Sequence, residues 1–317
     1  MLIQRLLLHI FQHIAIKSTI NFLLGLLVGI FIASQHLFSH KSLAPVGKDI
    51  TDRLANNSTS KSEESTQIIT NVAEVKLSLN QKNIGEFYEE YYKFYEQNHA
   101  WALKSFLGVH FLQNPNDAIT IAEILYNQDV DLVIETGTYR GAAALFFASI
   151  MYQYRYDAKK NSMRPFKIIT MDINPEARKY IENFTLLAPY ILFIPESSVS
   201  PAARATVNKT VFEMKPNNVF ISLDGDHYAE AVYNELLYYQ QYVVNISNYM
   251  LVQDTRLSRK WHTLYCGQSK YDGPCNGPQE AVNWFMKNEG HGRFEIDRAK
   301  EYLFTTHQKG WLKRISK

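Results

Sequence analysis

The sequence predicts an α/β protein built on a mostly parallel, seven-stranded sheet. Short apolar runs alternate with helix-like stretches over much of the chain, which is typical of strands covered by helices on both faces. Two strand-like runs near the C-terminus follow each other with no helical stretch between them, which predicts an antiparallel C-terminal strand. Four of the apolar runs end in an acidic residue, which indicates a ligand site along one edge of the sheet.

The composition is ordinary for a globular protein with a buried core, with 46% hydrophobic and 20% charged residues among 317. The net charge of +2 is small, and no stripe of Lys and Arg is interleaved with aromatic residues. These features argue against a nucleic-acid partner.

The N-terminal part has a different character from the rest of the chain. After a short segment, 1–18, residues 19–38 are strongly apolar, and no charged residue occurs from Ile20 to Ala33. A stretch of about twenty apolar residues can cross a bilayer as a helix. We expect an uncleaved transmembrane anchor and a single-pass membrane protein, with a cleaved signal peptide as the alternative.

Residues 39–81 are polar and show no lasting apolar period, which predicts a flexible stem. Cys266 and Cys275 either pair or remain reduced. Asn-x-Ser/Thr sequons and a disulfide belong to a secretory compartment, so we expect a type II protein whose folded domain is luminal or extracytoplasmic. The sequons begin at Asn56, Asn57, Asn183, Asn208 and Asn245.

The folded domain is expected to span 82–317 and to begin with a helical extension, 82–128. A second helix of this extension is expected from about Asp117, whose carboxylate is the candidate cap. The first helix, from about residue 83, has an aromatic face formed by Phe87, Tyr91, Phe94 and Tyr95.

Strands and helices alternate after the extension. Five parallel strands are expected at 131–136, 166–173, 191–196, 218–224 and 249–254. Helices are expected at 141–154, 175–184, 200–214, 228–243 and 278–288. The last two strands are expected at 294–298 and 302–308. A parallel sheet that ends in an antiparallel hairpin is the mark of the Rossmann-like class I methyltransferase fold.

The turn after the first strand, ETGTYRG, predicts a ligand with a ribose and no pyrophosphate. Only Gly137 and Gly141 are present, so the G-x-G-x-x-G pattern of a nicotinamide oxidoreductase is missing. Glu135 and Gly137 would line the amino-acid end of the ligand, with a plain strand-to-helix turn as the alternative. Asp172, after the second strand, could accept from both ribose hydroxyls, or it could cap the next helix.

Further candidates lie in the neighbouring loops. Ser197 and Ser198, after the third strand, could reach an adenine ring by hydrogen bonds. Tyr139 and Arg140 are placed near the cofactor or substrate by their position in the loop alone. The full set predicted to bind the cofactor is Glu135, Thr136, Gly137, Tyr139, Arg140, Gly141, Asp172, Ser197, Ser198 and Asp224.

The stretches LDGDHY and VQDT predict a metal-assisted site. Asp224 and Asp254 end adjoining strands and could converge on one hard divalent cation, for which oxygen ligands favour Mg²⁺. Such an ion could hold a substrate hydroxyl and lower its pKa. His227 is the candidate base and Asp226 its catalytic neighbour, while the alternative makes Asp226 a helix cap.

Taken in order, several motifs resemble the cephalosporin hydroxylase/rhamnosyl O-methyltransferase family. They are ETGTYRGAAALFFA, MDIN, LDGDH, QDT, GPQEAV and FEIDR…EYLFTTHQKGWLKR, and they span roughly 101–314. The resemblance implies a class I fold, S-adenosylmethionine as cofactor and Mg²⁺ beside it. It also implies methyl transfer to a hydroxyl of a sugar, a glycolipid or a related small molecule, which is the predicted acceptor.

Two residues depart from the family pattern. Gln253 stands where the family has a second acid before Asp254, although its carbonyl oxygen could still be the third metal ligand. Glu196 stands where the family tends to have glycine, and its bulk could narrow an adenine pocket. Both departures favour the rival hypothesis, a membrane-tethered binding protein of the same fold with weakened catalysis.

Overall fold

The computed structural model describes residues 81–155, 164–266, 271, 273–301 and 304–316. Residues Lys82–Lys317 belong to one compact unit. The predicted N-terminal segment 1–18, the anchor 19–38 and nearly all of the stem 39–81 lie outside the described residues, so these domain assignments stay predictions.

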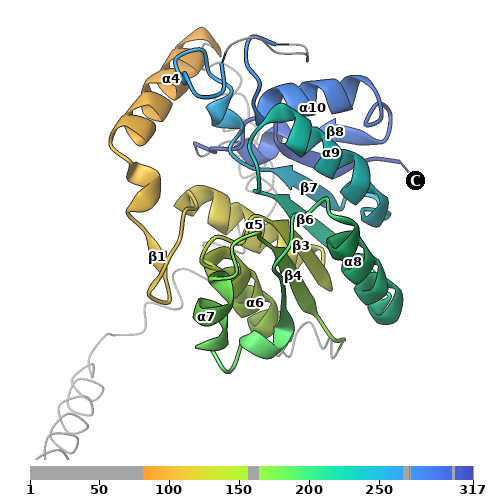
Figure 1. Cartoon of the computed structure of the whole chain (residues 1–317). Helices are drawn as coiled ribbons and strands as arrows, with labels where there is room; N and C mark the ends of the chain where they lie inside the picture. The colour runs from red at the N-terminus through yellow and green to blue at the C-terminus, as the bar shows by residue number, and fades with distance from the viewer. Residues whose placement is uncertain (1–80, 156–163, 267–270, 272, 302–303, 317) are drawn as a thin grey trace, which may run out of the picture. The chain divides into compact units, whose positions relative to one another are not determined.

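The predicted sheet is confirmed. Seven strands form one sheet in the order β5-β4-β3-β6-β7-β9-β8. Figure 1 labels β3, β4, β6, β7 and β8 of this sheet. The parallel strands are β3 (Leu132–Thr136), β4 (Lys167–Met171), β5 (Ile191–Ile194), β6 (Val219–Leu223) and β7 (Tyr249–Val252). Strand β9 (Trp311–Arg314) pairs antiparallel with both β7 and β8 (Phe294–Ile296). The chain therefore has a Rossmann-like methyltransferase fold with an antiparallel C-terminal strand.

The expected final strand at 302–308 is wrong. The 3₁₀ helix η5 (Arg298–Glu301) follows β8, and the last strand begins only at Trp311. Residues 304–308 form an irregular segment because their polar groups bond to other elements instead of a sheet neighbour. The Thr306 amide and hydroxyl both donate to Asp117, and the amide of Asp254 donates to Nδ1 of His307.

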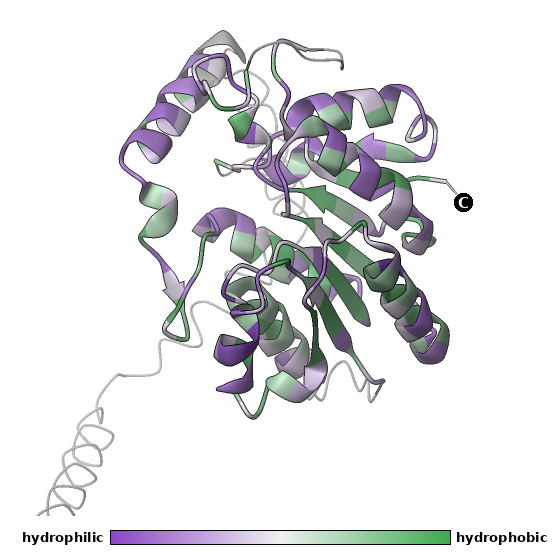
Figure 2. Cartoon of the chain, viewed as in Figure 1, coloured by the Kyte–Doolittle hydropathy of each residue, from purple (hydrophilic) through white to green (hydrophobic). Residues whose placement is uncertain are grey.

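Helices cover both faces of the sheet, as the near-continuous apolar strands require. Helices α5 (Pro115–Asn127) and α6 (Ala142–Arg155) pack on the face that carries Val133. Helices α8 (Pro201–Met214), α9 (Ala229–Tyr239) and α10 (Pro278–Lys287) pack on the face that carries Leu132 and Ile134. Figure 2 shows the hydrophobic residues gathered on the strands between these layers.

Two expected helices are shorter than predicted. The expected helix at 228–243 is divided into α9 and the 3₁₀ helix η3 (Gln240–Tyr242). The expected helix at 175–184 is the six-residue α7 (Ala177–Glu182). A further 3₁₀ helix, η2 (Ala188–Tyr190), leads into β5.

The N-terminal extension is helical only in part. Helix α4 (Gln81–Gln97) and the 3₁₀ helix η1 (Ala100–Ala102) precede a small hairpin of β1 (Ser105–Phe106) and β2 (Val109–His110) that the sequence did not indicate. The expected cap of α5 is also corrected. Asn114 accepts from the amide of Asn116 and caps the helix, while Asp117 instead holds the segment around Thr306.

The prediction of a single-pass membrane location, with the membrane as a partner, is corrected. In the ranges that the structure describes, no helix combines the length and the apolar character needed to cross a bilayer. The segment on which that prediction was based, 19–38, lies outside those ranges.

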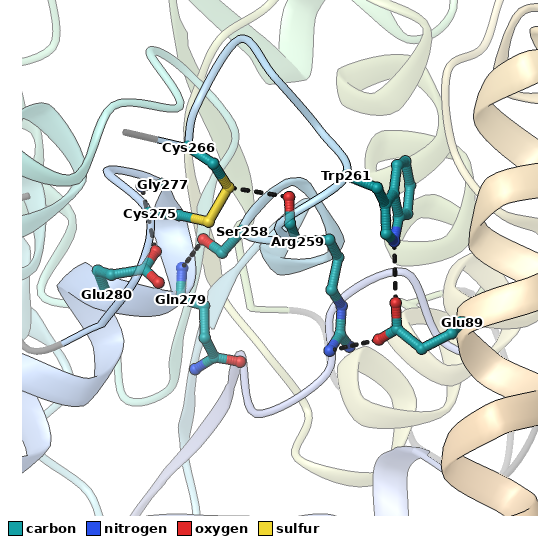
Figure 3. The surroundings of a disulfide bond; sticks show 9 residues. All are labelled: Glu89, Ser258, Arg259, Trp261, Cys266, Cys275, Gly277, Gln279 and Glu280. Carbon is teal, nitrogen blue, oxygen red and sulfur yellow. Dashed lines mark hydrogen bonds and ion pairs between the residues drawn. A yellow bond between two sulfur atoms is a disulfide. The ribbon is translucent and has the colours of Figure 1, made fainter. Parts of the chain in front are cut away.

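The two cysteines form a disulfide, Cys266–Cys275, which decides between the alternatives that the sequence left open (Figure 3). The bridged segment follows the 3₁₀ helix η4 (Thr255–Leu257) and precedes α10. In the same connection, Arg259 and Trp261 both contact the carboxylate of Glu89 on α4, each at 2.9 Å (Figure 3). The disulfide closes a loop within the segment between η4 and α10, and the contacts with Glu89 tie that segment to the extension.

We expect the double variant Cys266→Ser/Cys275→Ser to lower the free energy of unfolding by about 2–3 kcal/mol, because the bridge closes a loop in the unfolded chain and lowers its conformational entropy. Urea unfolding of the wild type and the variant measures this difference. Dithiothreitol should lower the stability of the wild type by a similar amount and leave the double variant unchanged. Equal stability of the two proteins would show that the bridge does not constrain the unfolded state.

Candidate active site

A cavity of about 650 Å³ opens where the parallel strands end at their carboxyl edge. This is the edge at which open α/β sheets bind ligands. Loops after β3, β4, β5 and β6 contribute to its wall, together with α9, residues 110–113 of the extension, and Asp254 after β7. A cavity of this volume is large enough for a nucleoside-sized cofactor.

The loop after β3 forms one wall of the cavity, and it needs glycine at position 137 because the loop after β6 packs against it. Gly137 has φ +79°, and a Cβ atom there would lie 1.9 Å from the carbonyl oxygen of Asp224. The space at Gly137 is therefore filled by the loop after β6, although Gly137 also lines the cavity. Tyr139 has φ +51°, and its amide donates to Asp172 at 2.7 Å.

Asp172 lies at the end of β4 and lines the cavity, as predicted. Its Oδ2 accepts from the Tyr139 amide, and its Oδ1 accepts from the Asn174 amide at 2.9 Å. Asp172 does not cap α7, whose N-cap residue is Glu176, and the Glu176 side chain makes no capping hydrogen bond. The two amides hold the carboxylate in place, and each oxygen keeps a lone pair for a further donor.

Glu135 lies below the cavity instead of in its wall. It is fully buried and accepts from the hydroxyl of Thr170 at 2.5 Å. Burial raises the pKa of Glu135 well above its usual range, and the carboxylates of Asp224 and Asp172 add to the effect. Thr136 is also buried, and its hydroxyl accepts from the Asp224 amide. Both residues support the loops instead of lining the ligand space.

Arg140 and Gly141 do not contribute to the cavity wall either. The guanidinium of exposed Arg140 lies over the rings of Tyr139 and Tyr180, at 5.3 and 5.7 Å from their centroids. Gly141 has φ +83°, and a Cβ there would lie 2.7 Å from the side chain of Ile181. Both residues therefore contact α7 instead of the cavity, and their predicted contact with the cofactor stays a prediction.

The loop after β5 also lines the cavity. Ser197, Ser198 and Glu196 all line the cavity. Glu196 is exposed, so its side chain can point to solvent. The hydroxyl of Ser198 donates to Glu235 of α9 at 2.5 Å. Burial raises the pKa of Glu235 to about 7.

Three predicted residues converge where β6 and β7 end. Nε2 of His227 lies 3.5 Å from Oδ1 of Asp224 and 3.5 Å from Oδ2 of Asp254. Burial opposes protonation of His227, but its contact with Asp224 and the charge of Asp254 outweigh it and raise the pKa of His227. Burial also raises the pKa of Asp224. Asp226 lines the cavity beside them and accepts from the Tyr228 amide at 3.0 Å.

Gln253 does not join this cluster. Its carbonyl oxygen accepts from the amide of Gln113, and its own amide donates to Ser222 at 2.6 Å. The side chain is almost completely buried and does not line the cavity. The role of Gln253 as a metal ligand therefore has no support in the geometry, because its side chain is buried away from the cavity and bonded to Gln113 and Ser222.

Arg256 places a fixed positive charge beside Asp254, and the sequence did not reveal it. The buried guanidinium contacts both Asp254 and Glu96 of α4. Burial alone would raise the pKa of Asp254, but Arg256 and His227 lower it below its usual value. Asp254 is thus held as a carboxylate. The only hint of this pairing in the sequence is that an arginine follows Asp254 by two residues.

Two other parts of the cavity wall were not predicted from the sequence. Residues 110–113 line it although they belong to the extension, and nothing in their sequence indicates this. Glu235 did leave a signal, because it is three residues from Val232 and four from Tyr239, on the apolar face of α9. An acid on the buried face of a helix is unusual enough to mark a candidate site.

Comparison with known proteins identifies the class. Residues 98–315 match the family described as Rhamnosyl O-methyltransferase/CmcI. Rhamnosyl O-methyltransferase of Mycobacterium leprae is 30% identical over 232 residues, which cover 71% of this chain and 90% of that protein. The protein of that name from Mycobacterium tuberculosis (strain ATCC 25618 / H37Rv) is 28% identical over 232 residues, which cover 71% of this chain and 84% of that protein.

A solved structure of CmcI with Mg and SAM has a TM-score of 0.46 and 14% identity, covering 68% of this chain and 78% of that one. By the family model that it matches and by its relatives, this protein is an S-adenosylmethionine-dependent O-methyltransferase. The chain belongs to the rhamnosyl O-methyltransferase/CmcI family, which confirms the resemblance seen in its motifs.

Proposed function

We propose that this enzyme transfers the methyl group of S-adenosylmethionine to a hydroxyl group of a sugar, with His227 as the base. The observation that carries the proposal is one cavity that has Asp172 in one wall and the cluster of Asp224, His227 and Asp254 in another. The names of the mycobacterial relatives refer to rhamnosyl groups and support a sugar as acceptor.

The cofactor would lie along the carboxyl edge of the sheet. The strand order places Ser197 and Ser198 beyond Asp172, and the loop of Gly137 on the other side of Asp172. Asp172 would accept from the ribose hydroxyls, with the serines at the adenine and the β3 loop at the amino-acid end. The methyl group would then point toward His227, beyond the end of β6.

The reaction needs a hydroxyl oxygen in line with the methyl group and a base for its proton. Nε2 of His227 is buried and makes no hydrogen bond of good geometry within the described part of the chain, although two carboxylates lie 3.5 Å away. In the neutral imidazole this atom can accept the proton of the acceptor hydroxyl. Asp224 and Asp254 would stabilise the imidazolium that forms. Since methyl transfer requires little covalent chemistry from the protein, positioning should supply much of the rate.

Magnesium assistance is a second feature of the proposal. Ligand atoms of Asp224, His227 and Asp254 lie within 4.8 Å of one another, so this cluster could hold one metal ion. A divalent cation would hold the acceptor hydroxyl and lower its pKa. Asp224 and Asp254 are its candidate ligands here, and Gln253 is not.

The acceptor would enter beside an aromatic group formed by Tyr228, His262 and Tyr265. The rings of Tyr228 and His262 lie 5.2 and 5.3 Å from that of Tyr265, and Tyr265 lies 6.4 Å from His227. Aromatic rings offer flat apolar surfaces with polar edges, which suit the apolar face of a pyranose. This group adjoins the proposed base, which supports a sugar ring as the methyl acceptor.

The first test is a calorimetric titration of S-adenosylmethionine into the full chain. We expect binding by the wild type and at least about tenfold weaker binding by Asp172→Ala, because two ribose hydrogen bonds to a charged group are lost. Exposed Glu182→Ala on α7 is the matched control and should bind like the wild type. Transfer of labelled methyl from the cofactor to rhamnosyl acceptors is then measured.

Two results would overturn the proposal. The folded wild type could fail to bind the cofactor, or it could bind the cofactor and methylate no sugar hydroxyl. Repeating the assay with a chelator tests the magnesium feature separately, since loss of activity that Mg²⁺ restores is the expected result if the ion takes part.

A further inference from the structure

Glu235 is a buried acid in the wall of the cavity, and the mechanism above does not use it. Its side chain belongs to the apolar face of α9, and the residue is 2% exposed. Gly225 leaves the room for it, because a Cβ at Gly225 would lie 3.1 Å from Oε1 of Glu235. Burying a carboxylate is unfavourable unless it forms hydrogen bonds, so the hydrogen-bond partners of Glu235 must stabilise it in this position.

The main partner of Glu235 is Ser198, in the loop after β5. The Ser198 hydroxyl donates to Oε1 of Glu235 at 2.5 Å. The Ser198 backbone is held as well, because the hydroxyl of Tyr239 donates to its carbonyl oxygen at 2.6 Å. Glu235 and Tyr239 are one turn apart on α9, so a single helix face fixes both the side chain and the backbone of Ser198.

This bond determines what Ser198 can offer to a ligand. A hydroxyl has one proton to donate and two lone pairs to accept with. Since the proton of Ser198 is used on the Glu235 carboxylate, the oxygen can act toward the cavity only as an acceptor. A ligand group at this point must therefore be a donor, such as an amino group, and a carbonyl oxygen there would face a lone pair.

The place of Ser198 in the sheet indicates which part of the ligand it meets. Strand β5 is the edge strand next to β4, and Asp172 follows β4. The proposed base His227 follows β6, two strands away from β4 across the sheet. With the ribose at Asp172 and the methyl group near His227, Ser198 lies on the side of the purine base.

We propose that Glu235 is a positioning residue that fixes Ser198 as an acceptor and thereby selects a cofactor whose purine carries an amino group at position 6. This inference rests on the proposed cofactor, and it deepens that proposal by assigning selection of adenine over hypoxanthine to a buried pair. Neither Glu235 nor Ser198 touches the reacting atoms.

The measurement is best made at pH 8, where Glu235 is mostly a carboxylate. Burial raises its pKa to about 7, the hydroxyls of Ser198 and Thr136 and the charge of His227 oppose the rise, and Asp226 adds to it. A protonated Glu235 could itself donate to Ser198 and release the serine proton toward the ligand. Ser198 is therefore restricted to accepting from the ligand only when Glu235 is a carboxylate.

The test compares calorimetric binding of S-adenosylhomocysteine with that of S-inosylhomocysteine, which has a carbonyl oxygen in place of the 6-amino group. For the full-length wild type we expect about 10- to 100-fold tighter binding of the adenosyl compound. The inosyl compound binds more weakly because its carbonyl oxygen and the Ser198 oxygen are both acceptors and leave each other unpaired. Glu235→Leu frees the proton of Ser198, so the preference should fall to within about threefold. Ser198→Ala removes the oxygen and should give the same loss.

Two further variants separate selection from general damage. Glu235→Gln keeps an oxygen that can accept from Ser198 and should retain most of the preference. Glu213→Leu, at an exposed position of α8, should leave both affinities unchanged. A purely structural role for Glu235 would weaken both compounds equally and leave their ratio at the wild-type value, which is a result that a melting curve alone would not reveal.

The outcomes test the proposed cofactor and the proposed role of Glu235 separately. If the wild type binds neither compound, the proposed cofactor is wrong. If it binds both equally, or if Glu235→Leu keeps the wild-type ratio, the cofactor proposal stands and the role of Glu235 is overturned.

Discussion

Replacing His227 by alanine is expected to lower kcat for methyl transfer by about 10²- to 10⁴-fold, the range for loss of a positioned general base. The reason is geometric, because Nε2 of His227 lies 3.5 Å from the carboxylates of both Asp224 and Asp254 in the cavity wall. Affinity for S-adenosylhomocysteine should change less than about threefold, since the proposed cofactor contacts lie at Asp172 and the β5 loop. Steady-state kinetics and calorimetry measure the two quantities.

The matched control is His291→Ala, which removes an exposed histidine after α10 and should leave kcat unchanged. Added imidazole should restore part of the activity of His227→Ala, because a small base can enter the space left by the ring. Unchanged kcat in His227→Ala would exclude this residue as the base. A loss of cofactor affinity as large as the loss of kcat would show instead that His227 supports the cofactor site.

Gly137→Ala is expected to lower the free energy of unfolding by about 3–5 kcal/mol, among the largest effects of a single substitution. A Cβ at this position would lie 1.9 Å from the carbonyl oxygen and 2.5 Å from the carbonyl carbon of Asp224, and both are backbone atoms. The β3 and β6 loops would have to separate, because neither contact can be relieved by a side-chain rotation. Urea unfolding, followed by tryptophan fluorescence, measures the loss.

Gly108→Ala separates the overlap from the backbone strain. Gly108 has φ +78°, close to the +79° of Gly137, but a Cβ there would meet no atom of the described residues within 4 Å. Its substitution should cost only about 1–2 kcal/mol, the penalty for a side chain in the left-handed region. Equal losses in the two variants would show that φ alone makes glycine necessary at Gly137.

Local pattern was sufficient for most of the sheet. The runs that became β3, β4 and β6 are apolar along most of their length, since strands with helices on both faces bury nearly every side chain. The acids Asp172, Asp224 and Asp254 could be assigned to the ligand edge because the carboxyl ends of parallel strands lie together. These features are properties of consecutive residues, which is why they can be read without the fold.

Two of the errors share one physical cause, which is competition from a distant partner. Residues 304–308 have the composition of a strand, but Asp117 bonds to Thr306 and His307 accepts from the Asp254 amide, so the last strand begins later. Asp117 was expected to cap α5, and Asn114 does so instead. Bonds between residues so far apart in the chain leave no periodic signal.

The sequence by itself determined the class I sheet, its antiparallel C-terminal strand, the acids along its carboxyl edge and the family to which the chain belongs. Only the tertiary structure decided which of the candidates share the cavity. It turned Gln253 toward Gln113, buried Glu135 below the β3 loop, paired Arg256 with Asp254 and brought Glu235 to Ser198. The reason is that a residue type defines which bonds a side chain can make, whereas packing decides which partner is near enough to make them.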